Sequence, residues 1–408
     1  MERNRFKNAA MTESNPLWEQ AVKRFKPLYN RKNDIRSEFF RDYNRILHST
    51  AYRRLKFKTQ VFFATKNDHL CTRIEHVNHV AAISKTIAGF IGLNTELTDA
   101  IAIGHDLGHA PFGHAGEKII KEICQKTNLE PFWHEKNSLR FVDFFETLQD
   151  PEGCEQNLNL TYAVRDGIIS HCGEVDEPYL YPRNKNIDLE TLKSPSENAP
   201  YTWEGCVVKI ADKIAYLGRD IEDAYISKIL TFPQKPLIKL LRAYLGDVKR
   251  EELNNTFIIH RFIINLCELS NPSDGIRFSP EYLNLMNEIK KFNYEYIYLH
   301  PRLENYKNYA ALIINSIYDV LYSLYDSDHT ISALEANLEF YPLMIIYFKE
   351  WLLKYSNLND RSGKHNKYHN SVIYDLANES DYQQAIIDFI SGMTDRFAIR
   401  IFEEITSF

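Results

Sequence analysis

The amino-acid sequence predicts a mainly α-helical fold. Apolar residues recur at helical spacing over residues 73–91 and again over 203–227, where they form one stripe. Strand-like patterns are confined to residues 60–65 and parts of 180–192. A chain with many helical stretches and few short strands builds its core by packing helices on helices.

In chain order, the first 30 residues are expected to form a polar lead-in. Residues 31–60 are locally basic, with nine Lys or Arg against Asp34, Glu38 and Asp42, a net charge of +6. This charge favours an anionic ligand. A solvated face of an amphipathic helix explains the same pattern, so both interpretations stay open.

The apolar periodicity then predicts a series of helices. They cover residues 73–91, a stretch that starts near 95 and carries His105 and Asp106 at its carboxyl end, and residues 115–126, 135–148, 162–171, 203–227, 257–269, 309–325, 341–355 and 377–408. Four prolines fall between 174 and 200, and we expect an irregular excursion with a short hairpin there. We find no internal repeat and no clean linker. The expected parts are a lead-in at 1–30, a helical core at 31–230 and a helical extension packed on it at 231–408.

Composition excludes several classes of protein. The 408 residues are 44% hydrophobic and carry a net charge of −6, which excludes a wholly basic nucleic-acid coat and a disordered or fibrous chain. No run of about 18 apolar residues offers a membrane span. The six cysteines are scattered without a CxxC pair, and the amino terminus has no secretory apolar segment. We therefore expect a cytoplasmic protein.

Histidines concentrate in one window and suggest a metal site. Eight of the fourteen lie between positions 69 and 171, three of them in the glycine-rich run GHDLGHAPFGHAG at 104–116. Imidazole and carboxylate are common ligands of borderline divalent metals, and His105-Asp106 follows a predicted helix, where adjacent side chains can reach one ion. His76 and Asp212 are candidate ligands from other helices. On spacing alone, satisfied core histidines and a solvated aspartate explain these residues as well.

The pattern H…HD…D resembles the HD-domain metal-dependent phosphohydrolases. Longer stretches resemble the deoxyguanosinetriphosphate triphosphohydrolase (dGTPase) family of dNTP triphosphohydrolases. These stretches are residues 36–62, TRIEH at 72–76, 104–117, HEKNSLR at 134–140, ADKIAYLGRDIEDA at 211–224 and DFISGMTDRFA at 388–398. The resemblance implies an HD-domain helical core, with His76, His105, Asp106 and Asp212 as ligands of one divalent metal. Mn, Mg, Fe, Ni, Zn and Co all suit such ligands, and a second Mg²⁺ bound with the triphosphate is allowed.

The resemblance also implies catalytic and substrate-binding residues. His114 and Glu117 would form a catalytic dyad, and His109 and His134 would line the triphosphate. The implied substrate-binding residues are Gln60, Lys213, Tyr216 and Asp220. Arg73, one turn before His76 on the same helix, is placed to meet a phosphate that the metal holds, and Arg54 of the basic segment would add to the same positive field. Gln60 would contact the sugar 3′-hydroxyl. Two plainer interpretations remain: the histidines and glycines of 104–116 brace a tight turn that needs positive φ, and 211–224 is an amphipathic helix with surface ion pairs.

The resemblance implies a metal-dependent, dGTP-preferring dNTP triphosphohydrolase. It would release deoxynucleoside and inorganic triphosphate after water attack at the α-phosphorus, and it would assemble as a homo-oligomer. The alternatives are another HD-domain phosphohydrolase, such as a nucleotidase or cyclic-nucleotide phosphodiesterase, or a sensor that binds nucleotide or single-stranded nucleic acid. A P-loop kinase or ATPase is disfavoured because no GxxxxGK[ST] loop is present.

Overall fold

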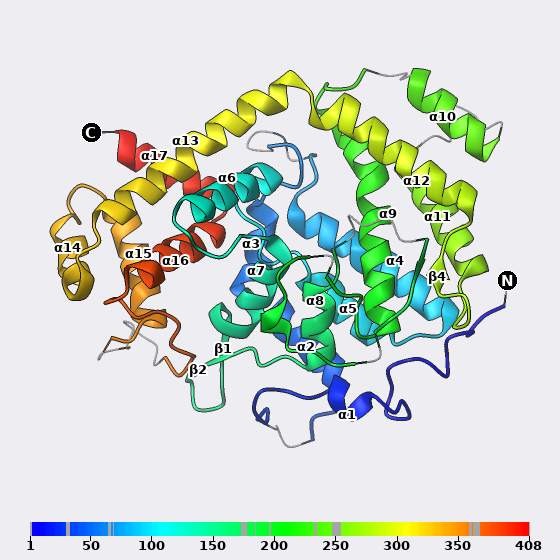
Figure 1. The fold of residues 1–408 in the computed structure, drawn as a ribbon, viewed down its shortest axis with the longest axis horizontal. Coiled ribbons are helices and arrows are strands. Elements are labelled where there is room, and N and C mark those ends of the chain that lie inside the picture. The colour runs from blue at the N-terminus through cyan, green and yellow to red at the C-terminus, as the bar shows by residue number, and fades with distance from the viewer. Residues whose placement is uncertain are drawn as a thin grey trace.

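The computed structural model describes residues 2–29, 33–63, 67, 69–172, 178–183, 185–195, 197–231, 235–246, 254–358, 361 and 368–407. In these residues the fold consists of α-helices α1 to α17 and two small sheets of two strands each (Figure 1). The expectation of a mainly α fold with short strands is confirmed. No described helix is both long and apolar enough to cross a membrane.

Among the described residues, the first half of the chain contains nine α-helices. They are α1 (Trp18–Ala21), α2 (Glu38–Leu47), α3 (Thr50–Arg54), α4 (Arg73–Ile91), α5 (Thr95–Gly104), α6 (Gly113–Lys126), α7 (His134–Arg140), α8 (Tyr162–Ile169) and α9 (Trp203–Ile226). A 3₁₀ turn η1 (Leu55–Phe57), a π turn η2 (Phe141–Phe145) and a 3₁₀ turn η3 (Leu189–Thr191) lie among them. Strands β1 (Thr147–Gln149) and β2 (Glu155–Asn157) pair antiparallel.

Helix α5 lies at the centre of the core. It packs against α2, α4, α8 and α9, and seven of its ten residues are buried. The Asn94 side chain caps its first turn by accepting the N–H groups of Glu96 and Leu97. A capping box between Thr72 and Glu75 fixes the start of α4 in the same way. Both α4 and α5 also pack against α9.

The second half forms an outer layer of helices. They are α10 (Lys235–Leu245), α11 (Asn255–Leu269), α12 (Pro280–Asn293), α13 (Pro301–Ser323), α14 (Thr330–Ala336), α15 (Pro342–Tyr355), α16 (Glu379–Ser391) and α17 (Asp395–Thr406). The π turn η5 (Tyr294–Tyr298) continues α12, and the 3₁₀ turn η6 (Ser327–His329) precedes α14. Helix α13 lies across α6 and reaches α16 and α17 (Figure 1).

The amino-terminal lead-in packs onto this core. Phe6 and Met11 are buried, and the Arg5 guanidinium donates to carbonyls at the end of α11. The buried Glu204 carboxylate on α9 accepts the N–H groups of Met11 and Asn94. One carboxylate therefore ties the lead-in to the start of α5.

Two predicted helices are shorter than expected. The helix predicted over 135–148 ends at Phe145, because the Glu146 carboxylate binds Thr50 and Arg54 and the chain then enters β1. The helix predicted over 377–408 is broken between α16 and α17, where Thr394 caps a new helix by accepting the Phe397 N–H.

The strand expectations are also corrected. Thr59 forms a single bridge with Thr72, and Gln60, Val61 and Phe62 follow as bends, while residues 64–66 lie outside the described part of the chain. Within 174–200, β3 (Tyr179–Leu180) pairs with β4 (Ile276–Arg277) instead of forming a local hairpin. Gly275, next to β4, has φ of +81°, and a side chain there would meet the Leu180 carbonyl, so the distant pairing depends on a glycine.

Candidate active site

Four side chains from three helices converge beneath a cavity. The Nε2 atom of His76 lies 2.9 Å from Asp212 Oδ1 and 3.9 Å from Asp106 Oδ2. The Nε2 atom of His105 lies 3.4 Å from Asp106 Oδ1 and 3.9 Å from Asp212 Oδ1. His76 comes from α4, His105-Asp106 follows α5, and Asp212 lies on α9. The predicted ligands are thus brought together.

The donor set fits a divalent metal. His105 Nε2 is buried and has no hydrogen-bond partner in the described structure, while its Nδ1 lies 2.6 Å from the Ala102 carbonyl. A backbone acceptor at Nδ1 fixes the tautomer that leaves Nε2 free for a metal. Ligand atoms of His76, His105 and Asp212 all lie within 4.8 Å of one another. Two imidazoles and two carboxylates suit several borderline divalent ions.

The charges around this cluster favour ionised carboxylates. Burial raises the pKa of Asp106, but His105, His109 and Arg73 outweigh it and hold that pKa well below its usual range. Burial likewise opposes ionisation of Asp212, and the hydrogen bond from His76 lowers its pKa to about 2. Both aspartates therefore present anionic oxygens at neutral pH.

Arg73 supports the cluster and keeps part of its guanidinium unpaired. Its Nη1 donates to Asp106 Oδ2 at 2.7 Å and its Nε donates to the Thr59 carbonyl at 3.1 Å. The remaining Nη2 is buried without a hydrogen-bond partner among the described residues, and Arg73 lines the cavity. A buried guanidinium nitrogen with an unused donor is suited to a phosphate oxygen.

The glycine-rich turn places His109 and His114 by close packing as well as by backbone freedom. Of its four glycines, only Gly113 has a positive φ, +60°, and the preceding Phe112 has φ of +67°. A side chain at Gly108 would meet backbone atoms of Asn137 and Ser138 at under 2.5 Å. The backbone of the loop therefore packs directly against α7. His109 Nε2 lies 3.1 Å from Asp106 Oδ1.

Glu117 joins two histidines. Its carboxylate lies 3.5 Å from His114 Nδ1, one turn earlier on α6, and 3.1 Å from His134 Nδ1 at the start of α7. Burial lowers the pKa of His134, but the charges of Glu135 and Glu117 outweigh it and raise that pKa to about 10. The sequence suggested a His114-Glu117 dyad, and the structure adds His134 as the closer partner.

Helix α9 contributes the opposite wall. Asp212, Tyr216 and Asp220 lie one turn apart along it and all line the cavity. Burial raises the pKa of Asp220 to about 6, and the Tyr298 hydroxyl from η5 donates to its Oδ2. Gln60 also lines the cavity, and its Oε1 is buried without a hydrogen-bond partner in the described chain. These polar groups can bind hydroxyls of a ligand.

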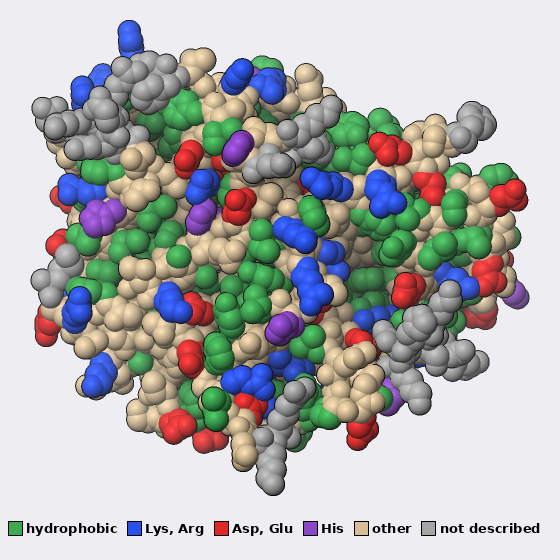
Figure 2. Space-filling view, turned by 180° about the vertical axis from the view of Figure 1, so that it is seen from behind, with side chains coloured by type: hydrophobic (Ala, Val, Ile, Leu, Met, Phe, Trp, Pro, Cys, Tyr) green, Lys and Arg blue, Asp and Glu red, His purple; other side chains and the backbone are tan. Residues whose placement is uncertain are grey.

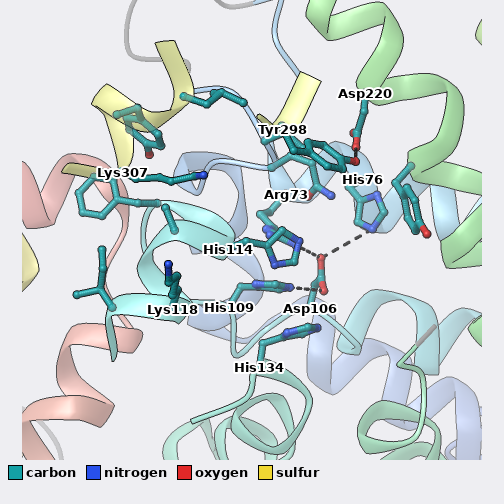
Figure 3. A pocket seen from close by; sticks show the side chains of 18 of the residues that line it. Arg73, His76, Asp106, His109, His114, Lys118, His134, Asp220, Tyr298 and Lys307 are labelled. Carbon is teal, nitrogen blue, oxygen red and sulfur yellow. Dashed lines mark hydrogen bonds and ion pairs between the residues drawn. The ribbon is translucent and has the colours of Figure 1, made fainter. Parts of the chain in front are cut away.

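The cavity has a volume of about 910 Å³, and different kinds of polar side chain line its different parts. Asp220 and Tyr298 lie at one end, the His76–Asp106 cluster in the middle, and Lys118 and Lys307 at the other end (Figure 3). Lys290, Lys291, Glu135 and His171 are further lining residues. No sequence pattern indicated a role for these residues. His171 lies in the histidine-rich window of residues 69–171, and that window could have pointed to it. Tyr298 and Lys307 lie more than a hundred positions beyond the window.

Two predicted substrate-binding residues do not line the cavity. Arg54 donates to Glu146 Oε1 at 3.0 Å, and Lys213 is buried on α9. Other charges of the basic segment are also used internally, because Arg45 donates to the Leu158 carbonyl and Lys58 to the carbonyls of His109 and Ser391. On the face shown in Figure 2, basic, acidic and apolar side chains are interspersed.

The motif at 388–398 braces the glycine-rich turn. Asp395 accepts the Thr59 N–H at 3.0 Å and the Phe112 N–H at 2.8 Å. Asp388 accepts from Arg140 and from the Tyr374 hydroxyl. The carboxyl-terminal helices thus fix both Thr59, next to Gln60, and the turn that leads to His114.

Comparison with known proteins identifies the class. The HD domain model matches residues 73–217, which include all four residues of the cluster, and the phosphohydrolase-associated domain model matches 276–336 and 364–404. The chain is therefore an HD-domain protein of the phosphohydrolase type.

Proteins that are similar to this chain over most of its length identify a narrower family within this class. A deoxyguanosinetriphosphate triphosphohydrolase-like protein of Caldanaerobacter subterraneus subsp. tengcongensis is 32% identical over 92% of this chain and 86% of its own length. Proteins of that name from Desulfatibacillum aliphaticivorans and Bartonella henselae are 33% and 29% identical, over 91% and 98% of this chain and 88% and 96% of theirs. The chain belongs to the family of deoxyguanosinetriphosphate triphosphohydrolase-like proteins.

Proposed function

We propose that the protein is a metal-dependent dNTP triphosphohydrolase that prefers dGTP and releases deoxynucleoside and inorganic triphosphate. The observation that supports this most is the order of groups along the cavity. Hydroxyl-binding side chains occupy one end, the His-Asp cluster the middle, and lysines the other end (Figure 3). A nucleoside triphosphate has the same order of sugar, α-phosphate and polyphosphate tail.

In this proposal, the two ends of the cavity orient the substrate. Gln60, Tyr216 and Asp220 hold the sugar through hydrogen bonds to its hydroxyl and ring oxygens. Arg73 Nη2, His109 and the protonated His134 contact the phosphates near the cluster, and Lys118 and Lys307 extend positive charge along the tail. The α-phosphorus then lies beside His76, His105, Asp106 and Asp212.

A divalent ion held by those four residues would supply Lewis-acid polarisation of the α-phosphate and a lowered pKa for water. The protein's own proton carrier is the pair of histidines on Glu117. His114, whose side chain is exposed to the cavity, protonates the departing 5′-oxygen while Glu117 holds the imidazole in position. The oxygen of water joins the α-phosphorus, the bond to the 5′-oxygen breaks with its electron pair on that oxygen, and the proton released from water replaces the one that His114 gave up.

Location and assembly are part of the same proposal. All six cysteines lie in the described part of the chain, are buried and form no disulfide, which supports a reducing, cytoplasmic compartment. We propose a homo-oligomer, by likeness to the family. Binding of single-stranded nucleic acid to residues 31–60 stays a prediction. Because Arg45, Arg54 and Lys58 of this segment bind groups within the protein, fewer of its charges are available to a nucleic acid than the sequence suggested.

Incubation with each dNTP and NTP in Mn²⁺ or Mg²⁺, followed by chromatography, tests the proposal. We expect deoxyguanosine and triphosphate from dGTP as the fastest reaction. Release of a nucleoside monophosphate or of single phosphate would instead indicate another HD-domain phosphohydrolase. The absence of turnover with every nucleotide would favour a binding sensor.

A further inference from the structure

The two ends of the cavity differ in how far their side chains are enclosed. At the sugar-binding end, Gln60 and Asp220 are no more than 6% exposed. At the other end, Lys118 and Asn308 line the cavity and are exposed to solvent. The side chain of His114, between the two ends, is 68% exposed (Figure 3). The polar groups that hold the sugar are thus buried, whereas the phosphate-binding end opens to solvent.

Helices α6 and α13 pack against each other and form the walls of this phosphate-binding end. On α6, His114, Lys118 and Glu122 line the cavity at successive turns. On α13, Lys307 and Ala311 do the same. Two turns of helix cover about 11 Å, whereas the α- and γ-phosphorus atoms of a triphosphate lie only about one turn apart. The walls therefore continue past the γ-phosphate of a substrate whose 5′-oxygen is next to His114.

Beyond the two lysines, the chemical character of the walls changes. One turn past Lys118, α6 presents the carboxylate of Glu122. One turn past Lys307, α13 presents the methyl group of Ala311, with the amide of Asn308 nearby. A further phosphate would be repelled by the carboxylate, whereas an amide donates hydrogen bonds to an uncharged polar group and accepts them from it. This part of the cavity, which we call the open end, therefore suits an uncharged polar group that follows the γ-phosphate.

We infer that the open end accepts a second nucleoside, so that the protein also cleaves dinucleoside triphosphates, in which a triphosphate joins the 5′-oxygens of two nucleosides. The volume of about 910 Å³ lies near the upper limit for small-molecule sites and fits such a ligand. The inference rests on the proposed function, because the reaction is the same. Water adds to the phosphorus beside the cluster, and the bond to the 5′-oxygen breaks with its electron pair on that oxygen. The oxygen takes a proton from His114, which the proton released from water replaces. From bis-deoxyguanosine triphosphate the products are deoxyguanosine and dGTP.

Comparison of bis-deoxyguanosine triphosphate with dGTP, in Mn²⁺ and at early reaction times, tests the inference. The dinucleotide has one negative charge fewer on its γ-phosphate, so its kcat/KM is expected to be about tenfold below that of dGTP. In ¹⁸O-enriched water, the first products are expected to be unlabelled deoxyguanosine and dGTP that carries the label in its γ-phosphate. Asn308→Trp fills the open end with an indole and is expected to lower kcat/KM about tenfold more for the dinucleotide than for dGTP. Asn305→Trp, at an exposed position of α13 outside the cavity, is the matched control and keeps the wild-type ratio.

The other outcomes contradict the inference or separate it from the proposed function. An enzyme that cleaves dGTP but leaves the dinucleotide intact would overturn it, and so would cleavage to dGMP and dGDP, which breaks a bond inside the triphosphate. An unchanged ratio in Asn308→Trp would overturn the assignment of the second nucleoside to the open end. If dGTP itself yields no deoxyguanosine, the proposed function fails. Isothermal titration calorimetry with both compounds then tests the open end alone: similar Kd values would support it, and binding of dGTP only would overturn it.

Discussion

The region from α4 to α9 and the region from α12 to α17 build the same cavity with different kinds of contribution. The first region carries all the histidines and aspartates of the cluster, on helices packed around α5. The second region carries Tyr298 and Lys307 on the cavity wall, and Asp395 behind the glycine-rich turn. Chemistry is thus concentrated in one region, whereas the other shapes the substrate site and holds the turn in place.

This difference predicts that substitutions in the two regions have different effects. Changes in the first region remove metal or turnover, and changes in the second alter substrate binding or stability while the metal stays bound.

Asp106→Ala has the largest expected effect. The carboxylate contacts Arg73 and lies within 4 Å of three histidines, so its removal takes away a ligand and the partner of a buried guanidinium. We expect loss of both bound metal and hydrolysis, measured by elemental analysis and product release. Asp99→Ala on α5, which removes an ion pair with Lys85, is the control and keeps both. Full activity with stoichiometric metal in Asp106→Ala would contradict the HD-type site.

Glu117→Gln is expected to lower kcat by about 10²- to 10⁴-fold with the metal retained. Glu117 contacts His114 and His134 and lies outside the four-residue cluster, so its charge positions and polarises imidazoles. Steady-state kinetics and metal analysis measure the two quantities separately. Glu122→Gln on the same helix serves as the matched control. Loss of metal together with activity would show that Glu117 is misplaced in this account.

Lys118→Met is expected to raise KM for dGTP about tenfold, because one charged contact to phosphate contributes about 1.5 kcal/mol. Lys118 lines the far end of the cavity on α6 (Figure 3). Lys121→Met changes an exposed lysine one turn along that does not line the cavity, and its KM stays at the wild-type value. Equal KM values in the two variants would remove Lys118 from the tail-binding end.

Asp395→Asn tests the contribution of the carboxyl-terminal region. The buried carboxylate accepts two backbone N–H groups, and an amide replaces one acceptor oxygen with a donor. The expected cost is about 1–3 kcal/mol of unfolding free energy, with metal content unchanged. Thermal and urea unfolding measure it, and Asp381→Asn on α16 is the control at a more exposed carboxylate. Unchanged stability and kcat would show that the turn does not need this brace.

Asp223→Asn has the smallest expected effect on activity and a clear one on pH dependence. Burial raises the pKa of Asp223 to about 7, well above the ordinary value of about 3.9 for aspartate. The folded protein therefore binds this proton more tightly than the unfolded chain between about pH 4 and pH 7. Stability falls as pH rises through that window, by up to about 1.4 kcal/mol per unit from this group. Urea unfolding at several pH values is expected to give a flatter profile for Asp223→Asn. Identical slopes would contradict the assignment.

Much of this architecture follows from local sequence patterns. The helix predicted at 73–91 has those bounds in the structure, because Thr72 and Glu75 form a capping box and Gly92 ends the helix in the left-handed region. The H…HD…D pattern also identified the four residues whose side chains converge in the structure, His76, His105, Asp106 and Asp212. Their roles as metal ligands remain a prediction.

Long-range contacts explain the features of the site that local sequence patterns did not predict. Tyr298 reaches Asp220 only because α12 and η5 pack on α9, and no local pattern encodes that packing. Asp395 meets Phe112 across 283 positions. Arg54 belongs to a basic run that suggested phosphate binding, yet its tertiary partner is Glu146. Charge counts along the chain do not distinguish internal ion pairs from ligand sites.

The central claim is that hydrolysis occurs at the α-phosphorus of a dNTP, between a sugar-binding end and a phosphate-binding end of one cavity. Hydrolysis of dGTP in ¹⁸O-enriched water, followed by mass spectrometry of the products, tests it most directly. We expect one ¹⁸O atom in inorganic triphosphate, unlabelled deoxyguanosine, and no accumulation of dGMP, dGDP or pyrophosphate. Label in a nucleoside monophosphate, or single phosphate as the first product, would contradict it even if the metal cluster were confirmed.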